Sequence, residues 1–229
     1  ILGMGTGTYA NQCRKYYGDM PVEGVEIDEK ITDLARKYFE LPEDVKVTTY
    51  DGRAYLNVDE KKYDVIMVDA YQDITIPFQM SSVEFFTLVK DHLTQDGVMV
   101  VNMNMRGSGE DSINAYLADT IGSVFGEVYT VDVKGSTNRE LFASNNPRML
   151  ENLRVHREEI KDEGLYAMME AVSDNLTVYQ AGGRIMTDDQ APVELLGMRV
   201  IDELIQGEVA AYKDLYEEKG IKGVLDSLL

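Results

Sequence analysis

The stretch that decides the fold is Ile1-Leu2-Gly3-Met4-Gly5-Thr6-Gly7-Thr8, an apolar start that runs directly into a Gly-x-Gly-x-Gly turn. A strand that ends in glycines lets a ligand approach the backbone closely, because no Cβ intervenes and a positive φ costs little. About two dozen residues later, a second apolar run ends in Glu26, which would present a carboxylate to a ribose diol. The two features together predict a nucleoside-cofactor site and leave open a dinucleotide or S-adenosylmethionine.

Outward from this turn, short apolar runs alternate with longer amphipathic stretches, which is typical of a parallel sheet covered by helices on both faces. Residues 63–69 and 97–104 are almost continuously apolar, as strands buried on both faces are. The pattern predicts strands at 1–3, 22–27, 45–50, 63–69 and 97–104, and helices at 8–17, 29–39, 52–57, 81–93 and 109–124. A closing antiparallel hairpin is expected from 128–133 and 141–144, which flank a Gly-Ser-Thr-Asn turn.

The character of the chain changes at Asn146, which divides an expected cofactor-binding domain, 1–146, from a helical extension, 147–229. The pattern of the extension predicts helices at 147–171, 191–206 and 208–228 and a short strand at 175–180. Because no low-complexity linker separates the two parts, we expect the extension to pack on the same domain. The start inside a strand and without Met predicts that residues upstream are missing.

Composition narrows the classes of function. The formal net charge of −19 argues against nucleic acid as a partner and suits a cationic small molecule, although an acidic surface also serves solubility alone. A single cysteine, Cys13, rules out an internal disulfide and fits a reducing compartment. No run of about 18 apolar residues is present, so we expect no membrane span and a cytoplasmic protein. No His or Cys pair has the spacing of metal ligands, so no metal site is predicted.

A second carboxylate bears on the choice of cofactor. Asp51 follows the third expected strand and precedes Gly52, at the sheet edge where ligands bind in such folds. It would accept a hydrogen bond from the adenine amine, or it caps the helix that begins at Gly52. Five strands interleaved with helices and followed by an antiparallel hairpin predict an α/β, class I methyltransferase-like (Rossmann-like) three-layer fold, with a mostly parallel sheet.

Several motifs resemble those of the spermidine synthase family. They are Gly3-Met4-Gly5-Thr6-Gly7-Thr8, Val25-Glu26-Ile27-Asp28, Asp51-Gly52-Arg53, the run Tyr-Asp-Val-Ile-Met-Val-Asp-Ala-Tyr at 63–71, Phe85-Phe86 ahead of Asp96-Gly97-Val98, and the tail phrase Met-Thr-Asp-Asp-Gln-Ala-Pro-Val-Glu at 186–194. The resemblance implies transfer of an aminopropyl group from decarboxylated S-adenosylmethionine to putrescine, in polyamine biosynthesis, by a homodimer or homotetramer. It implies a cofactor site of Gly3, Gly5, Thr6, Gly7, Glu26, Ile27, Asp51 and Gly52, with Glu26 on the ribose and Asp51 on the adenine amine.

The same resemblance places Asp69 opposite the acceptor amine, with Tyr71, Gln72 and Asp73 as further acceptor-binding residues. An alkylamine has a pKa near 10.4, so only about one molecule in 10³ to 10⁴ is the free base at pH 7, a penalty of roughly 4 to 5 kcal/mol. A carboxylate that takes the proton and orients the nitrogen lone pair recovers part of that penalty. The alternative is that Asp69 only caps the loop that follows its strand.

Two positions depart from the family pattern, in which the glycine turn is Gly-Gly-Gly-Asp-Gly-Gly and the acceptor loop Asp-Ser-Ser-Asp-Pro. Thr6 stands where an acid grips the terminal amine of the aminopropyl chain, and Gln72 replaces the second acid of the loop or displaces it to Asp73. An acid at position 6 would repel the carboxylate of intact S-adenosylmethionine, so Thr6 also permits a small-molecule N-methyltransferase. A third interpretation, from another class, is a non-catalytic nucleoside-binding or regulatory domain.

Two other segments have a choice of roles. The loop 74–80 is expected to cover the substrate as a lid, or its Phe78 and Met80 simply pack on the sheet. Asp188 and Asp189 precede Pro192, where they suit an N-cap of the next helix or a second carboxylate site for an amine.

Overall fold

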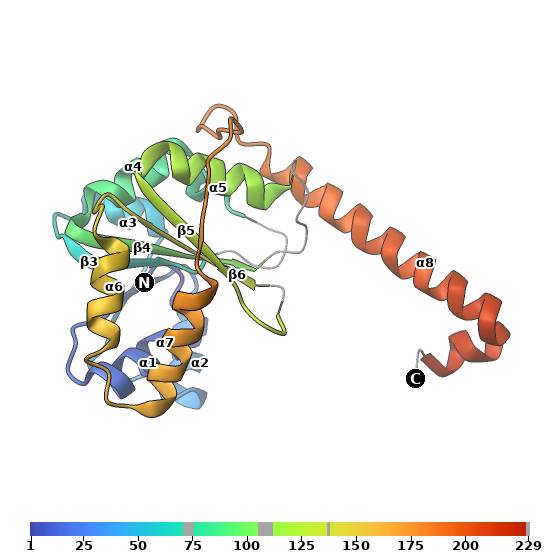
Figure 1. Cartoon of the computed structure of the whole chain (residues 1–229), viewed down its shortest axis with the longest axis horizontal. Helices are drawn as coiled ribbons and strands as arrows, with labels where there is room; N and C mark the ends of the chain where they lie inside the picture. The colour runs from blue at the N-terminus through green and yellow to red at the C-terminus, as the bar shows by residue number, and fades with distance from the viewer. Residues whose placement is uncertain (71–75, 105–111, 137, 228–229) are drawn as a thin grey trace.

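The computed structural model describes residues 1–70, 76–104, 112–136 and 138–227, and it shows an α/β body from which one long helix extends (Figure 1). The first half comprises α1 (Thr8–Tyr17), β1 (Glu23–Glu26), α2 (Glu29–Tyr38), β2 (Lys46–Thr49), α3 (Gly52–Val58), β3 (Tyr63–Val68), the 3₁₀ helix η1 (Phe78–Met80), α4 (Val83–Asp91) and β4 (Leu93–Asn104). The second half comprises α5 (Ile113–Val124), β5 (Glu127–Asp132), β6 (Asn138–Ser144), α6 (Met149–Arg157), α7 (Glu163–Asn175), β7 (Thr177–Val178) and α8 (Val193–Ser227).

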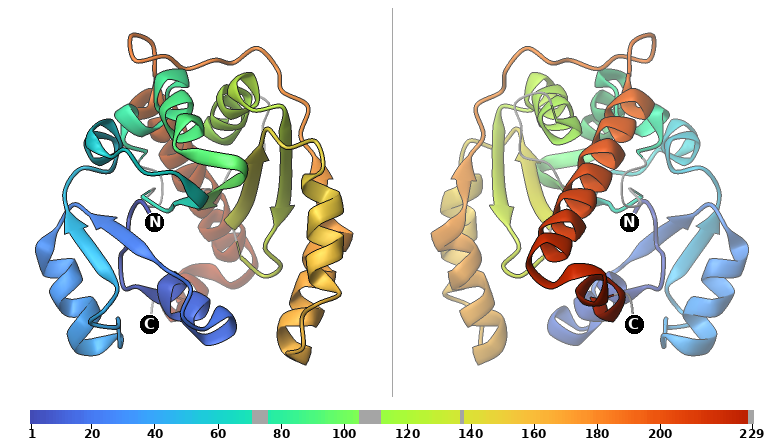
Figure 2. Two further views of the ribbon diagram at one scale, coloured as in Figure 1. Left: turned by 90° about the vertical axis from the view of Figure 1, so that its left-hand side faces the viewer. Right: turned by 90° about the vertical axis from the view of Figure 1, so that its right-hand side faces the viewer.

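The strands form two ribbons joined by one residue. β1 and β2 pair in parallel, and the other strands lie in the order β3-β4-β6-β5-β7. Leu2 makes a parallel bridge to Val25 of β1 and another to Val68 of β3, so the predicted first strand is reduced to the residue that links the ribbons. The two ribbons lie on opposite sides of the body in Figure 2.

The predicted hairpin is present as antiparallel β5 and β6, and β6 also runs antiparallel to β4. β3 and β4 are parallel, so their carboxyl ends meet at the same edge of the sheet. Helices α3, α4 and α5 lie on one face of the sheet and α1, α2, α6 and α7 on the other (Figure 1).

The main core lies between β3, β4, β6 and the helices α4 and α5. Phe85 and Phe86 of α4 are fully buried, and their rings meet edge to face with centroids 5.2 Å apart. The helix that carries these two residues, α4, is capped by Ser82, whose side chain accepts a hydrogen bond from the Phe85 N–H. These contacts fix α4 in the core.

The extension differs from its predicted helices. The helix predicted at 147–171 is two helices, because Asp162 accepts a hydrogen bond of 2.8 Å from the Leu165 N–H and so starts α7 as a new helix. The division predicted at residue 207 between two helices lies instead at Gly220 within α8, since Gly207 is accommodated inside a helix at a modest cost. The non-helical residue within α8 is Gly220, with φ 65°.

The extension also contributes to the sheet and the core. β7 pairs with β5, and Met186, Val193 and Leu196 belong to the main hydrophobic core. The segment after β7 is held by Asp119 of α5, a carboxylate that is 1% exposed and accepts hydrogen bonds from the Tyr179 hydroxyl at 2.6 Å and from the Gly182 N–H at 2.7 Å. The start of α8 is thereby fixed against the body.

Among the residues that the structure describes, no helix has the length and apolar character needed to cross a membrane. The same residues contain no group of three or more His, Cys, Asp or Glu side chains placed to hold a metal ion.

Candidate active site

The glycine turn lies against the end of β3. Gly3 has φ +87°, and a Cβ at this position would lie 2.5 Å from the carbonyl oxygen of Asp69. Only glycine therefore fits where the turn and the end of β3 come together. Gly7 forms the N-cap of α1 and is packed on Leu41, outside the cavity lining, whereas Gly3 and Gly5 line the cavity.

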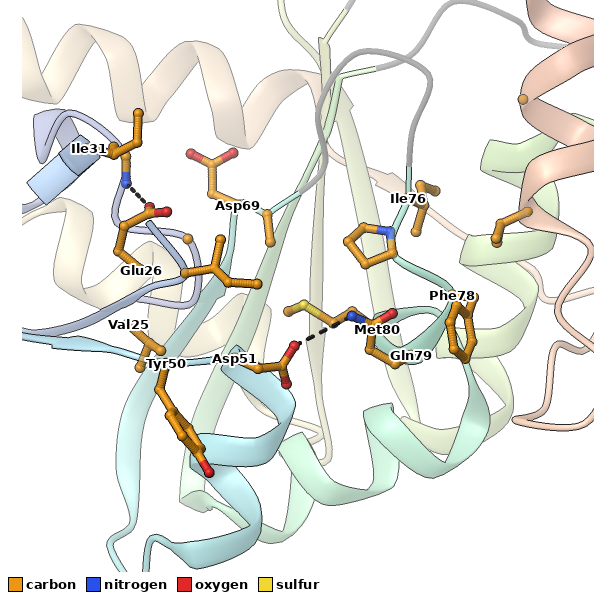
Figure 3. Close-up of a pocket in the computed structure, with 18 of the residues that line it drawn as sticks. Val25, Glu26, Ile31, Tyr50, Asp51, Asp69, Ile76, Phe78, Gln79 and Met80 are labelled. Carbon is orange, nitrogen blue, oxygen red and sulfur yellow. Dashed lines mark hydrogen bonds between the residues drawn. The ribbon is translucent and has the colours of Figure 1, made fainter. Parts of the chain in front are cut away.

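Glu26 ends β1 and is only 8% exposed. Its Oε2 accepts a hydrogen bond of 2.9 Å from the Gly5 N–H (Figure 3), and its Oε1 accepts one of 3.2 Å from the Asp28 N–H. This carboxylate thus fixes the glycine turn, which the sequence pattern did not indicate. A carboxylate has about four lone-pair sites, so two used by the backbone leave others for a ligand.

Asp51 caps a helix and also lines the cavity. Its Oδ1 accepts a hydrogen bond of 2.8 Å from the Ala54 N–H and so caps α3. Its Oδ2 lies 3.4 Å from the Gln79 Nε2, on the side of the cavity (Figure 3). The cap orients the carboxylate, and the second oxygen faces the space where a ligand would lie.

A cavity of about 820 Å³ connects these groups, a size common for small-molecule sites. Several apolar side chains on its wall are open to solvent, among them Ile27 at 72%, Tyr50 at 51% and Phe78 at 56%. Its lining residues are Gly3, Gly5, Thr6, Val25, Glu26, Ile27, Ile31, Tyr50, Asp51, Gly52, Asp69, Ala70, Ile76, Pro77, Phe78, Gln79, Met80, Val193, Glu194, Gly197, Met198 and Ile201. Exposed apolar walls of this kind are expected where a ligand covers them.

One wall of the cavity comes from α8, which sequence reasoning did not include in the site. Val193, Gly197 and Ile201 recur at helical spacing and lie along the cavity, together with Glu194 and Met198. The signal in the sequence is the helical spacing of these residues after Pro192, which predicts the helix but not the surface that the helix covers.

Asp69 follows β3 and lies on the cavity wall (Figure 3). Its Oδ1 accepts a hydrogen bond of 2.9 Å from the Asn102 Nδ2, and the Asn102 Oδ1 accepts one of 3.1 Å from the Asn138 Nδ2. Loss of solvent around the carboxylate raises the pKa of Asp69, while the hydrogen bond from Asn102 opposes that rise. The amides orient one oxygen and leave the other available for an amine.

The remaining predicted residues have different outcomes. Thr6 lines the cavity, and its hydroxyl lies 2.9 Å from that of Thr8. Ile27 and Gly52 also line the cavity. Tyr71, Gln72 and Asp73 lie outside the described residues, and so do the first two positions of the predicted lid, whereas residues 76–80 line the cavity.

Asp188 neither caps α8 nor lies in the cavity lining. Its carboxylate accepts two hydrogen bonds of 2.7 Å from the guanidinium of Arg53 and one of 2.5 Å from the Ser82 hydroxyl. The side chain is therefore an anchor between the loop before α8 and the body.

The fold and the cavity define a protein of the class I methyltransferase-like type. Two solved structures agree in fold: human Methyltransferase-like protein 13 in complex with SAH, with a TM-score of 0.58, 23% identity and coverage of 76% of this chain and 78% of that one, and a probable spermidine synthase from Corynebacterium glutamicum, with a TM-score of 0.55, 21% identity and coverage of 80% and 71%. The predicted fold class is thus confirmed.

Within that class, the chain belongs to the spermine/spermidine synthase family, whose domain model matches residues 1–131. A "Probable polyamine aminopropyl transferase" of Bifidobacterium longum is 52% identical over 98% of this chain and 54% of its own length. A "Polyamine aminopropyltransferase" of Vibrio vulnificus is 29% identical over 63% of this chain and 48% of its own. The chain thus spans about half the length of these curated relatives, and the predicted family is confirmed.

Proposed function

We propose that this chain transfers an aminopropyl group from decarboxylated S-adenosylmethionine to an amine such as putrescine, in polyamine biosynthesis. The observation that carries the proposal is one cavity that brings Glu26 and Asp51 together with Asp69. The first two suit a nucleoside, and the third suits a cationic acceptor. The 52% identical relative bears the name of this activity. Association into a dimer or tetramer stays a prediction from the resemblance.

The residues present fit the nucleoside part of this cofactor. Gly5 has φ +54°, and a Cβ added there would meet nothing within 4 Å, so its backbone faces open space on the cavity side. The exposed side chains of Ile27 and Tyr50 provide apolar surface for a base, and the Asp51 carboxylate provides an acceptor for its amine. Glu26, with lone pairs left beside its two backbone hydrogen bonds, would hold the ribose hydroxyls.

When bound, the cofactor supplies a methylene carbon activated by a positively charged sulfur. Asp69 would accept a hydrogen bond from the acceptor nitrogen, take one of its protons and leave the lone pair directed at that carbon. The hydrogen bond from Asn102 fixes one carboxylate oxygen, which favours a single orientation of the other. The wall from α8 and residues 76–80 would exclude water from the reacting groups.

A second candidate, a small-molecule N-methyltransferase, is favoured by one observation. The cavity wall has Thr6, a neutral residue, at the position where the family's acid would repel the carboxylate of intact S-adenosylmethionine. The same acceptor chemistry at Asp69 would serve a methyl transfer.

Calorimetry with the two forms of the cofactor, followed by mass spectrometry of the products with putrescine, tests the proposal. We expect tighter binding of the decarboxylated form and a product heavier by one aminopropyl group. A product heavier by one methyl group, formed with the intact cofactor, would establish the N-methyltransferase instead. Binding of neither form would contradict both enzymes, and binding without any product would indicate the non-catalytic domain.

A further inference from the structure

A carboxylate that the proposed reaction leaves unused, Glu140 of β6, lies beside Asp69. In the antiparallel pairing of β4 and β6, Glu140 stands directly opposite Asn102, the residue whose amide binds Asp69. Directly opposite residues of an antiparallel pair have side chains on the same face, with Cβ atoms about 4.5 to 5.5 Å apart. Asp69, Asn102 and Glu140 therefore form one polar group at the sheet edge.

One atom of this group has no partner. The Glu140 Oε2 is shielded from solvent and has no hydrogen bond within the described part of the chain. A shielded acceptor without a partner is unfavourable, so native proteins rarely leave one without a donor from the protein, water or a ligand. The amide of Asn138, two residues before Glu140 on the same face of β6, is directed to Asn102 instead.

We propose that Glu140 is a second amine-binding carboxylate of the acceptor subsite, which together with Asp69 holds the ammonium group of the acceptor. This inference rests on the proposed function for the identity of the acceptor. Glu140 is not itself among the residues that line the cavity, so the ammonium would lie between Asp69 on the wall and the Glu140 oxygen behind it. An ammonium has three donors, which allows it to bind both carboxylates.

The electrostatics of the free protein agree with this role. Burial, and after it the charge of Asp69, raises the pKa of Glu140 to about 7. The groups that face it are Asp69 at the end of β3, the neutral Asn102 of β4 and the phenol of Tyr9 in α1, whose pKa of about 12 keeps it uncharged. Without an amine Glu140 is largely protonated below pH 7, and an arriving ammonium stabilises its ionised form.

The binding equilibrium is then a proton exchange that balances in atoms and charge. The neutral carboxylic acid of Glu140 loses its proton to the buffer, the O–H bond breaks, and the ammonium enters with all its own protons. With a pKa of about 7, binding at pH 6.5 should release up to about three quarters of a proton, and binding at pH 8.5 almost none.

5′-Methylthioadenosine is the nucleoside that remains after the aminopropyl group has left the cofactor, so it fills the cofactor site without reacting. Calorimetric titration of putrescine into the protein saturated with this nucleoside, in buffers of different ionisation enthalpy, measures the proton release. We expect about half a proton or more at pH 6.5 for the wild type and for the control Glu151→Gln, an exposed carboxylate of α6. Glu140→Gln should lose most of that release and bind putrescine at least 10-fold more weakly at pH 8.5, with 5′-methylthioadenosine affinity within about threefold.

The outcomes separate this inference from the proposed function. If Glu140→Gln releases as many protons and binds putrescine as tightly as the wild type, the role of Glu140 is wrong, whether or not the protein turns over. If the wild type binds putrescine with the expected release but forms no aminopropyl product, Glu140 stands and the proposed function fails. If the wild type binds no putrescine, the acceptor subsite, and Glu140 with it, is wrong.

Discussion

Arg53 and Asp188, 135 positions apart in the chain, are joined by two parallel hydrogen bonds of 2.7 Å. Arg53 lies in the first turn of α3, two positions after the capping residue Asp51, and also donates a hydrogen bond of 3.0 Å to the carbonyl oxygen of Gln79. Asp188 precedes α8, whose first turns line the cavity. The pair therefore connects three parts of the cavity wall: α3, the segment 76–80 and the start of α8. The hydrogen bonds that Arg53 donates lower the pKa of Asp188.

Asp188→Asn should weaken nucleoside binding without contacting the nucleoside, because it loosens the start of α8. The Asp188 side chain is 39% exposed, so we expect the free energy of unfolding to fall by only about 1 kcal/mol, which corresponds to a fall in Tm of about 2 to 4 °C. The control is Asp132→Asn, which breaks a comparable pair with Arg139 on the β5–β6 hairpin. Equal effects of the two variants on nucleoside affinity would contradict the link to the cavity.

Asp69→Asn should abolish turnover while leaving cofactor affinity within a few-fold. The amide keeps the size of the side chain and loses the ability to take a proton from the amine. Single-turnover kinetics and calorimetry on the same preparation measure the two quantities. Turnover near that of the wild type would show that Asp69 only caps its loop.

Glu26→Gln should weaken cofactor binding by about 1 to 3 kcal/mol, the scale of a hydrogen bond to a charged group. The substitution should also lower Tm, because in the wild type the Glu26 carboxylate accepts hydrogen bonds from both the Gly5 N–H and the Asp28 N–H. Calorimetry and thermal unfolding measure the two effects. An unchanged cofactor affinity, with Tm lowered, would assign Glu26 to holding the turn and not the ribose.

Thr6→Asp should shift the preference toward decarboxylated S-adenosylmethionine. An acid at this point of the cavity wall would attract a terminal ammonium and repel a terminal carboxylate. The ratio of the two dissociation constants should change by about 10-fold or more, the effect of about 1.4 kcal/mol. The change should diminish with added salt, and a constant ratio would place the cofactor tail elsewhere.

Glu140→Gln should remove part of the pH dependence of stability. Because the pKa of Glu140 rises from its ordinary 4.5 to about 7 on folding, the folded state binds this proton more tightly than the unfolded state. The contribution of this proton to the stability of the folded state is therefore complete below about pH 4.5, falls as the pH rises to about 7, and is constant above that pH. The loss of Tm between pH 5.5 and pH 8.5 should be about 2 to 6 °C smaller in the variant, and an equal loss in both proteins would contradict the assignment.

The glycine turn, Glu26, Asp51 and Asp69 could be placed together from the sequence because carboxyl ends of parallel strands meet at one edge. Their local hydrogen bonds could not, since the Glu26 bonds to the turn depend on how β1 approaches it. The wall from α8 also escaped prediction, because a helix pattern says which residues share a face and not what that face contacts. Glu140 was missed for a similar reason: only the register of β6 against β4 brings it beside Asn102.

Leu2, the residue that bridges the two ribbons of the sheet, lies between the strand that ends in Glu26 and the strand that precedes Asp69. Glu26 belongs to the ribbon on one side of it and Asp69 to the ribbon on the other. The backbone of Leu2 donates to the Met67 carbonyl at 2.8 Å and accepts from the Asp69 N–H at 2.9 Å. On the other side, the Ile1 carbonyl accepts from the Val25 N–H at 2.9 Å and the Gly3 N–H donates to the Val25 carbonyl at 2.9 Å. In the proposed function, the distance between the nucleoside and the acceptor would therefore be set by this short segment, residues 1–3.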